Sequence, residues 1–248
     1  MRTASVLIKE LPAYRHYCFV SGLKANGYRV TQYPLTNPEP SDVLVLWNRH
    51  GSNEHYIRVY ERAGATVLIS ENGYIGPTRA LAKSHHNGAG EWYVGEEDRW
   101  SKLGIETTPW REDGDFILVL PQRGMGEPGV AMPRNWLPAM VNNLRAMTDR
   151  PIRVRKHPGQ NDTVPLINDL HGAWAAVTWG SGAGIKAIVH GIPVFYNMNK
   201  WIGALAARSE FDIENPYLGD RTEMLRRMAW AQWTSEELES GEAFRWLV

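Results

Sequence analysis

The feature that most constrains this chain is an alternation of short apolar runs with segments of helical periodicity. Four runs in the first seventy residues are typical of buried strands: residues 5–8, 28–32, 42–47 and 65–70. The segments 13–26 and 52–64 have helical spacing, the second with Ser52 as the expected N-cap. Strands that alternate with helices form parallel sheets with helical crossovers, so the pattern predicts an α/β fold.

The alternation stops over residues 71–115 and then resumes. That stretch is rich in Gly, Trp, His and charge, and we expect only short helices at 78–83 and 96–103. The second half has strand-like runs at 116–120, 151–155, 175–178 and 192–196, helical segments at 135–147, 164–170 and 182–190, and helical character from 200 to the end. We therefore predict two small Rossmann-like parallel-sheet domains, 1–112 and 113–248, with C-terminal helices that pack back across the junction.

Length and composition limit the class of protein but do not identify a binding partner. With 248 residues and 43% hydrophobic composition, the chain can bury a core. No run reaches the roughly 20 apolar residues that a membrane span needs, and the N-terminus leads into a strand rather than a signal peptide, so we expect a cytoplasmic protein with no membrane partner. The single cysteine, Cys18, excludes an internal disulfide and a cysteine-based zinc cluster, and no metal motif is evident.

Charge balance gives a second constraint. Lys plus Arg and Asp plus Glu each number 27, so no global field attracts the protein to nucleic acid or to an anionic membrane. Balanced overall charge does not exclude a local basic groove. Arginine far outnumbers lysine, and its planar fork suits bidentate capture of phosphate or carboxylate.

The candidate binding residues follow three strands of the second half. Ligands of open α/β sheets bind beyond the carboxyl ends of the strands, where helix N-termini present free N–H groups. In the turn 179–183, three small residues let the backbone approach a phosphate, and His157 follows a strand rich in arginine. The predicted phosphate-binding residues are Gln122, Arg123, Gly124, Arg155, Lys156, His157, Thr178, Gly180, Ser181, Gly182 and Ala183.

Each of these residues also has a structural interpretation. Any tight turn between strand and helix favours Gly and Ser, and Ser181 can either cap the helix or bond to a ligand. The turn has the spacing of neither a Walker loop nor a dinucleotide fingerprint. A lone histidine such as His157 is usually a structural hydrogen-bonding residue, and Arg153 and Arg155 face the opposite way from Lys156 in a regular strand.

These residues occur in an order that resembles a known family. The order strand-Lys-His-Pro, strand-Thr-Trp-Gly-Ser-Gly-Ala-Gly, helix and Gly-Ile-Pro-Val-Phe over residues 116–197 resembles the nucleotide-binding half of GT-B glycosyltransferases. It is similar to bacterial sialyltransferases, capsule Kdo transferases and glycerophosphotransferases. In those families a His-Pro dipeptide and a serine-bearing turn hold the phosphate and ribose of the donor, which implies these roles for His157 and Ser181. The chain departs from the pattern at Lys186 or a neighbour, where many GT-B enzymes have an acidic residue.

The GT-B resemblance implies a base for the acceptor hydroxyl and counter-charge for the leaving phosphate, with no obligatory metal. We expect the base in the first half, with Glu71, just past the last strand there, as the leading candidate. Asp98, His85 and His86 compete with it. The alternative role for Glu71 is a cap or turn residue, and for the histidines a surface turn that contacts the acceptor. No cofactor is expected beyond the nucleotide-sugar co-substrate.

Three functions stay open at this point. The first is a glycosyltransferase that uses a nucleotide-sugar donor. Because the layout ENGY…HNG…PW…PQRG resembles uncharacterised phage proteins, the acceptor could be a hydroxymethylated pyrimidine in DNA, flipped into a cleft lined by some of the eleven tryptophans. The second moves another group, an amino acid or a phospho-alcohol, in DNA hypermodification. The third binds a nucleotide or modified DNA without turnover. The sequence gives no oligomeric state.

Overall fold

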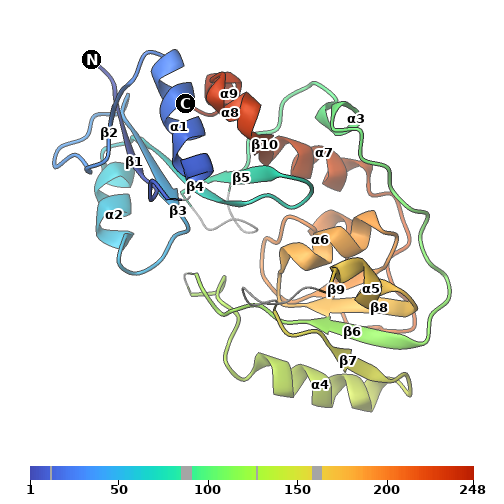
Figure 1. The fold of residues 1–248 in the computed structure, drawn as a ribbon. Coiled ribbons are helices and arrows are strands. Elements are labelled where there is room, and N and C mark those ends of the chain that lie inside the picture. Colours follow the sequence, from blue (N-terminus) through green and yellow to red (C-terminus); the bar gives the residue numbers. More distant parts are fainter. Residues whose placement is uncertain (12, 85–90, 127, 158–163) are drawn as a thin grey trace. The chain divides into compact units, whose positions relative to one another are not determined.

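The computed structural model describes residues 1–248 except for 12, 85–90, 127 and 158–163. The described chain forms two compact units, each with its own sheet (Figure 1). Unit 1 consists of Met1–Glu97 and Ala229–Val248, and unit 2 of Asp98–Met228. The division therefore lies at residues 97 and 98 rather than at the predicted 112 and 113. It also returns the segment 229–248 to unit 1, because the apolar side chains of that segment complete the core there.

Unit 1 is built on a six-stranded sheet in the order β10-β5-β4-β3-β1-β2. Its strands are β1 (Thr3–Leu7), β2 (Arg29–Thr31), β3 (Val43–Trp47), β4 (Thr66–Asn72), β5 (Thr78–Lys83) and β10 (Gln232–Thr234). The first four are parallel, as the sequence predicts. The last two run antiparallel, so this sheet is mixed rather than purely parallel.

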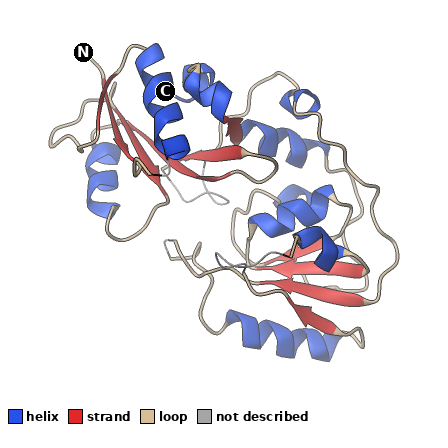
Figure 2. Cartoon of the chain, in the orientation of Figure 1, coloured by secondary structure: helices blue, strands red, loops and turns tan. Residues whose placement is uncertain are grey.

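Helices cover both faces of this sheet (Figures 1 and 2). One face packs against α1 (Ala13–Ala25), α8 (Ser235–Glu239) and α9 (Glu242–Leu247), and the other against α2 (Glu54–Arg62). Contacts at several points hold the C-terminal helices against α1 and the residue after it, among them a ring contact and a hydrogen bond. The rings of Phe19 and Phe244 lie 6.2 Å apart, and the amide of Asn26 donates to the carbonyl of Gly241 at 2.8 Å. Burial of Phe244 and of the other apolar side chains of this segment stabilises its position in unit 1.

The predicted helix at residues 78–83 is wrong, because this segment is the strand β5. Its residues favour helix, but in the sheet Leu81 is buried in the core of unit 1 and Ala80 pairs with Glu71 of β4. The pairing also extends β4 to Asn72, so Glu71 lies within a strand and not beyond it. Tertiary packing thus overrides local propensity here.

The start of α2 also differs from the prediction. The N-cap is Asn53 and not Ser52. The Ser52 hydroxyl is engaged elsewhere, with its oxygen 2.7 Å from Nδ1 of His50. The helix therefore begins one residue later than expected, and the described bond of the Ser52 hydroxyl is to His50 rather than to the helix backbone.

Unit 2 is built on a four-stranded parallel sheet in the order β7-β6-β8-β9. Its strands are β6 (Phe116–Leu120), β7 (Ile152–Val154), β8 (Ala173–Thr178) and β9 (Val194–Tyr196). The helices are α3 (Arg99–Lys102), α4 (Trp136–Met147), α5 (Leu166–Leu170), α6 (Gly182–Val189) and α7 (Thr222–Trp230), with a 3-10 turn η1 (Ala204–Ala206). In Figure 1, α4 covers one face of the sheet and α6 the other. The expectation of helix from residue 200 onward is wrong, since 207–221 are irregular and 232–234 form a strand.

Arg49, which follows β3, is a buried anchor in unit 1. Its guanidinium donates to both carboxylate oxygens of Glu54, at 3.0 and 2.8 Å, and to Glu61 at 2.9 Å. It also donates to the carbonyl of Ser84. The hydrogen bonds from Arg49 are the largest cause of the low pKa of Glu54, which is about 2. Arg58, whose Nε donates to the same carboxylate at 3.0 Å, lowers this pKa further, whereas burial of the carboxylate raises it. The ion pairs therefore stabilise the fold only while Glu54 is charged.

A Glu54→Gln chain should show how much stability this anchor contributes. Because the pKa of Glu54 is depressed in the folded state, its contribution is complete above about pH 4.5 and is lost as the pH falls toward 2. We expect the substitution to lower the free energy of unfolding by about 2 kcal/mol at pH 7 and to flatten the acid dependence below pH 4.5. Urea unfolding at pH 7 and pH 3 measures both effects.

The matched control is Glu223→Gln, which breaks the exposed pair with Arg226 in α7. It should cost no more than about 0.5 kcal/mol, since exposed pairs are screened by water. If Glu54→Gln behaved like this control, the anchoring role would be disproved.

Candidate functional site

The predicted binding residues of the second half gather at one edge of the sheet in unit 2. All four strands are parallel, so the loops that follow them lie at the same edge. In strand order, these loops are residues 155–157 after β7, 121–126 after β6, 179–183 after β8 and 197–201 after β9. The structure thus brings His157, Arg123 and Ser181 to neighbouring strand ends.

The turn after β8 is fixed by hydrogen bonds on both sides. The Thr178 hydroxyl donates to the carbonyl of Leu120 at 2.9 Å and accepts from the backbone N–H of Ser181 at 3.0 Å. The Ser181 hydroxyl is the N-cap of α6, accepting from the N–H of Ala183 at 3.2 Å. Of the two predicted roles for Ser181, the structure shows the cap, and the hydroxyl proton is still able to donate to a ligand oxygen.

The N-terminus of α6 gives this turn its electrostatic character. The first N–H groups of a helix have no intrahelical acceptor, and the helix dipole adds about half a positive charge there. No acidic residue lies in the first turn of α6, and Gly182 is half-buried at its start. A glycine there lets an anion approach the backbone closely.

Arg123 and His157 form a direct contact between the loops after β6 and β7. Nε of Arg123 donates to Nδ1 of His157 at 3.2 Å. A guanidinium nitrogen can only donate, so Nδ1 is the acceptor and the ring proton is assigned to Nε2. The imidazole can therefore offer an Nε2–H donor to a ligand while Arg123 adds positive charge beside it.

Arg155 and Lys156 differ in their surroundings. Arg155 forms an ion pair with Asp169 of α5 and donates to the carbonyl of Val164 at 2.8 Å, which ties α5 to the end of β7. Lys156 is exposed. The local bonds of Arg155 explain its position structurally, and a role for it in donor binding stays a prediction.

The charged side chains of these four loops have one sign among the described residues, and the carboxylate of Asp169 in α5 pairs with one of them, Arg155. The described residues of the four loops include the cationic side chains of Arg123, Arg155, Lys156 and Lys200, and no carboxylate. An anionic ligand therefore meets no described charge of its own sign in these loops.

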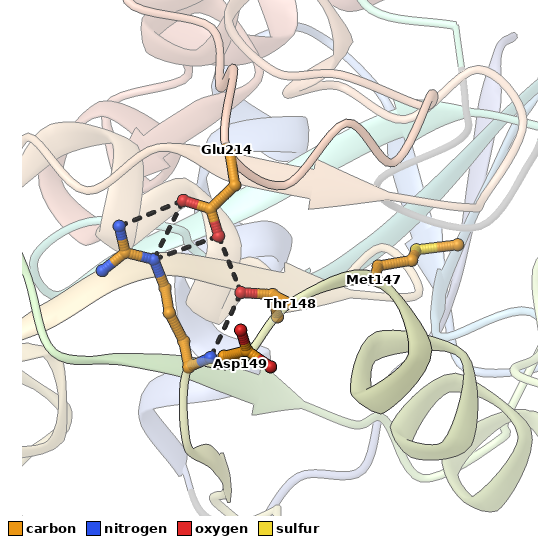
Figure 3. Close-up of a pocket in the computed structure, with 5 residues that line it drawn as sticks. Met147, Thr148, Asp149 and Glu214 are labelled. Carbon is orange, nitrogen blue, oxygen red and sulfur yellow. Dashed lines mark hydrogen bonds and ion pairs between the residues drawn. The ribbon is translucent and has the colours of Figure 1, made fainter.

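The opposite, amino edge of the same sheet is chemically different (Figure 3). A surface pocket of about 320 Å³ there is lined by Met147, Thr148, Asp149, Arg150 and Glu214. Arg150 donates to both oxygens of Glu214, at 3.0 to 3.2 Å, and the Thr148 hydroxyl donates to Glu214 at 2.7 Å. These bonds lower the pKa of Glu214, Arg150 more than Thr148. The side chains satisfy one another, so the cluster clamps the segment around Glu214 to this edge.

The three predicted catalytic residues are each described by their own surroundings, since Glu71 belongs to unit 1, Asp98 to unit 2, and His85 lies outside the described residues. Glu71 is half-buried in β4 of unit 1. Asp98 is the N-cap of α3, accepting from the N–H of Ser101 at 3.1 Å and from its hydroxyl, and these bonds lower the pKa of its carboxyl. Asp98 is thus a helix cap, whereas His85 and His86 lie outside the described residues. The assignment of Glu71 as the base stays a prediction.

The sequence prediction missed the fourth strand end. The loop after β9 lies beside the predicted turn, and its Asn197 accepts from the indole N–H of Trp136 at 2.7 Å. The signal was present, because the rule that ligands bind at carboxyl ends applies equally to the run 192–196 and the residues after it.

Two negative findings concern the described residues only. No group of three or more His, Cys, Asp or Glu side chains among them could hold a metal ion. No helix in this part of the chain is both long and apolar enough to cross a membrane.

Comparisons with known proteins give a fold relationship. No protein-family model and no curated protein matches the sequence. Among the solved structures that are similar are two of KpsC from Thermosulfurimonas dismutans. The beta Kdo 2,7 transferase has a TM-score of 0.58 at 15% identity, over 98% of this chain and 99% of that one. The beta Kdo 2,4 transferase has a TM-score of 0.58 at 13% identity, over 92% and 89%.

The fold is GT-B-like. This confirms the predicted class of two Rossmann-like sheets with helices, at an identity too low to carry function. Within the GT-B-like fold, the loops described above lie in unit 2, at the strand ends for which the sequence predicts donor binding.

Proposed function

We propose that the protein is a glycosyltransferase that binds a nucleotide-sugar donor at the carboxyl edge of the sheet in unit 2. The observation that carries the proposal is the contact of Arg123 with His157 beside the Ser181-capped start of α6, in loops without a described carboxylate. Similarity of fold to two Kdo transferases supports it. Kdo is the first sugar to test, because both of these similar structures are Kdo transferases.

In the proposed reaction, a sugar moves from the nucleotide phosphate to an acceptor hydroxyl. The bond between the sugar and the phosphate oxygen breaks, and the phosphate leaves with its negative charge. His157, through Nε2–H, and the N–H groups of α6 stabilise this charge, and Arg123 holds the imidazole in the required tautomer. The acceptor hydroxyl loses its proton to a base, for which Glu71 is our candidate. Basic groups and the helix terminus perform the role that a metal has in other transferases, so we expect metal-independent transfer.

A thermal-shift series against CMP-, UDP-, CDP- and GDP-sugars tests the donor site. A donor at 100 times its Kd should stabilise the fold by about 2.7 kcal/mol, which corresponds to a Tm increase of roughly 5 °C or more. Inorganic phosphate and the free sugars at equal concentration are the controls. If no nucleotide-sugar raised the Tm above these controls, the donor site would be disproved.

The acceptor is the second part of the proposal. Its class is a hydroxyl group, on a saccharide or on a hydroxymethylated pyrimidine in DNA. The balanced charge of the chain gives no global attraction to DNA, so saccharides come first. An assay with labelled donor and both acceptors identifies the product. Transfer of label to neither acceptor, with donor binding retained, would favour binding without turnover, and transfer of a different group would appear as a product that lacks the sugar.

A further inference from the structure

The asparagine that follows α1 holds the C-terminal helices through its side-chain amide. Nδ2 of Asn26 donates to two carbonyl oxygens, those of Gly22 in α1 and of Gly241 between α8 and α9, each at 2.8 Å. An amide nitrogen carries two hydrogens, so both donors of Asn26 are used. The amide therefore links α1 to the junction of α8 and α9, which lie beside it in Figure 1.

The backbones around this amide are in close contact. A Cβ on Gly241 would lie 2.4 Å from Nδ2 of Asn26 and 2.9 Å from the carbonyl oxygen of Gly22. A Cβ on Gly22 would in turn lie 1.8 Å from the carbonyl oxygen of Leu238 in α8. Since Asn26 is half-buried here, the two carbonyl oxygens depend on its amide for their hydrogen bonds.

Asn26 is followed by Gly27, and asparagine loses ammonia most readily in this sequence. Glycine has no side chain to shield its backbone nitrogen, which can attack the neighbouring side-chain amide. The chain has three such pairs, Asn26–Gly27, Asn72–Gly73 and a third at 87–88, which lies outside the described residues. Of the two that the structure describes, Asn26 has its amide bonded to the C-terminal segment, whereas Asn72 is exposed at the end of β4.

We propose that Asn26 is a deamidation site and that its modification releases α8 and α9 from α1. The backbone nitrogen of Gly27 loses its proton and bonds to Cγ of Asn26, the bond from Cγ to Nδ2 breaks, and ammonia leaves. Water then opens the resulting succinimide ring at either carbonyl carbon, which gives aspartate or isoaspartate. Water is the only co-reactant, and no atom is oxidised or reduced.

The product cannot form the same contact again. A carboxylate has no hydrogen to donate, so the oxygen in place of Nδ2 faces the carbonyl oxygens of Gly22 and Gly241. Repulsion between these oxygens, and the cost of burying a charge without a donor, oppose the return of the helices. In isoaspartate the main chain is also longer by the β-carbon. The release is therefore irreversible.

The bound C-terminal helices also protect Asn26 from the reaction. The N–H of Gly27 donates to the carbonyl of Lys24 at 2.9 Å, and the amide of Asn26 is held by its two acceptors, so the attack requires these bonds to open. Such local opening occurs in native proteins with a free energy that the surrounding contacts determine. Because Phe244 packs against Phe19 of α1, this packing limits how often Asn26 can react.

An Asn26→Asp chain contains the product of the reaction and tests its effect. Hydrogen exchange of the backbone amides in α8 and α9 should be about tenfold faster or more than in the wild type, whereas exchange in α2 should not change. The control is Asn72→Asp, which adds the same charge at an exposed position and should leave exchange in α8 and α9 as in the wild type. Unchanged exchange in Asn26→Asp would overturn the inference.

Peptide mapping by mass spectrometry, after incubation at mildly alkaline pH, measures the reaction itself in the wild type and in Phe244→Leu. The substitution weakens the packing on Phe19, so deamidation at Asn26 should be about fivefold faster or more, while the rate at Asn72 should stay the same. No increase at Asn26, or an equal increase at both asparagines, would overturn the inference, because the C-terminal helices would then give Asn26 no protection of its own.

Discussion

A Gly191→Ala chain should lose most of the stability of unit 2. Gly191 follows α6 with a φ of 73°, and a Cβ there would lie 2.0 Å from the carbonyl oxygen of Pro109. The clash is with backbone that is itself held, since Thr108 donates to Val189 at 3.0 Å and Arg111 donates to Gly191 at 2.7 Å. Left-handed strain and overpacking together should cost about 4 kcal/mol or more.

The control for this prediction is Gly104→Ala. Gly104 has a φ of 63°, but nothing lies within 4 Å of an added Cβ. It therefore carries the backbone strain without the clash, and we expect a loss of about 1 to 2 kcal/mol. Urea unfolding followed by tryptophan fluorescence compares the two chains. Equal losses would mean that the segment 108–111 moves aside easily and does not hold α6.

His157→Ala should have the largest effect on activity. The substitution removes the Nε2–H donor and leaves the Arg123 guanidinium without its imidazole acceptor at 3.2 Å. If the leaving phosphate depends on this pair, turnover of the nucleotide-sugar should fall about 100-fold or more, in line with the loss of one preorganised donor. Release of free nucleotide over time, measured with the donor that the thermal-shift series selects, gives the rate.

Two further variants are needed to interpret the result of His157→Ala, one as a control and one as a test of the base. His171→Ala, at the exposed end of α5, should keep full activity. Glu71→Ala should lose turnover while it binds nucleotide like the wild type, because a base acts on the acceptor and not on the donor. Full activity in both His157→Ala and Glu71→Ala would disprove the mechanism.

The fold was predictable where the pattern was repeated, and not where a single segment depended on distant partners. Eight parallel strands follow from apolar runs between helical segments, since such runs must be buried on both faces. The antiparallel strands β5 and β10 were missed. Residues 78–83 have helix-forming side chains, and their strand state depends on pairing with the preceding strand at Glu71 and with Gln232, which is far away in the sequence.

The candidate site was predictable by position more than by contact. The strand-end rule placed Arg123, His157 and Ser181 at one edge, and the structure agrees. The sequence could not show that Arg155 bonds to Asp169 or that Asp98 caps α3, because these partners depend on loop geometry.

The return of residues 229–248 to unit 1 affects the order in which the protein can fold during synthesis. Unit 2 is a continuous stretch and can form as soon as residue 228 has left the ribosome. Unit 1 is made first but completed last, because Trp233 and Phe244 must still arrive to cover the sheet beside α1. Until then the apolar face of its nascent sheet is exposed, which makes the earlier-made half of the chain the one that depends more on chaperones.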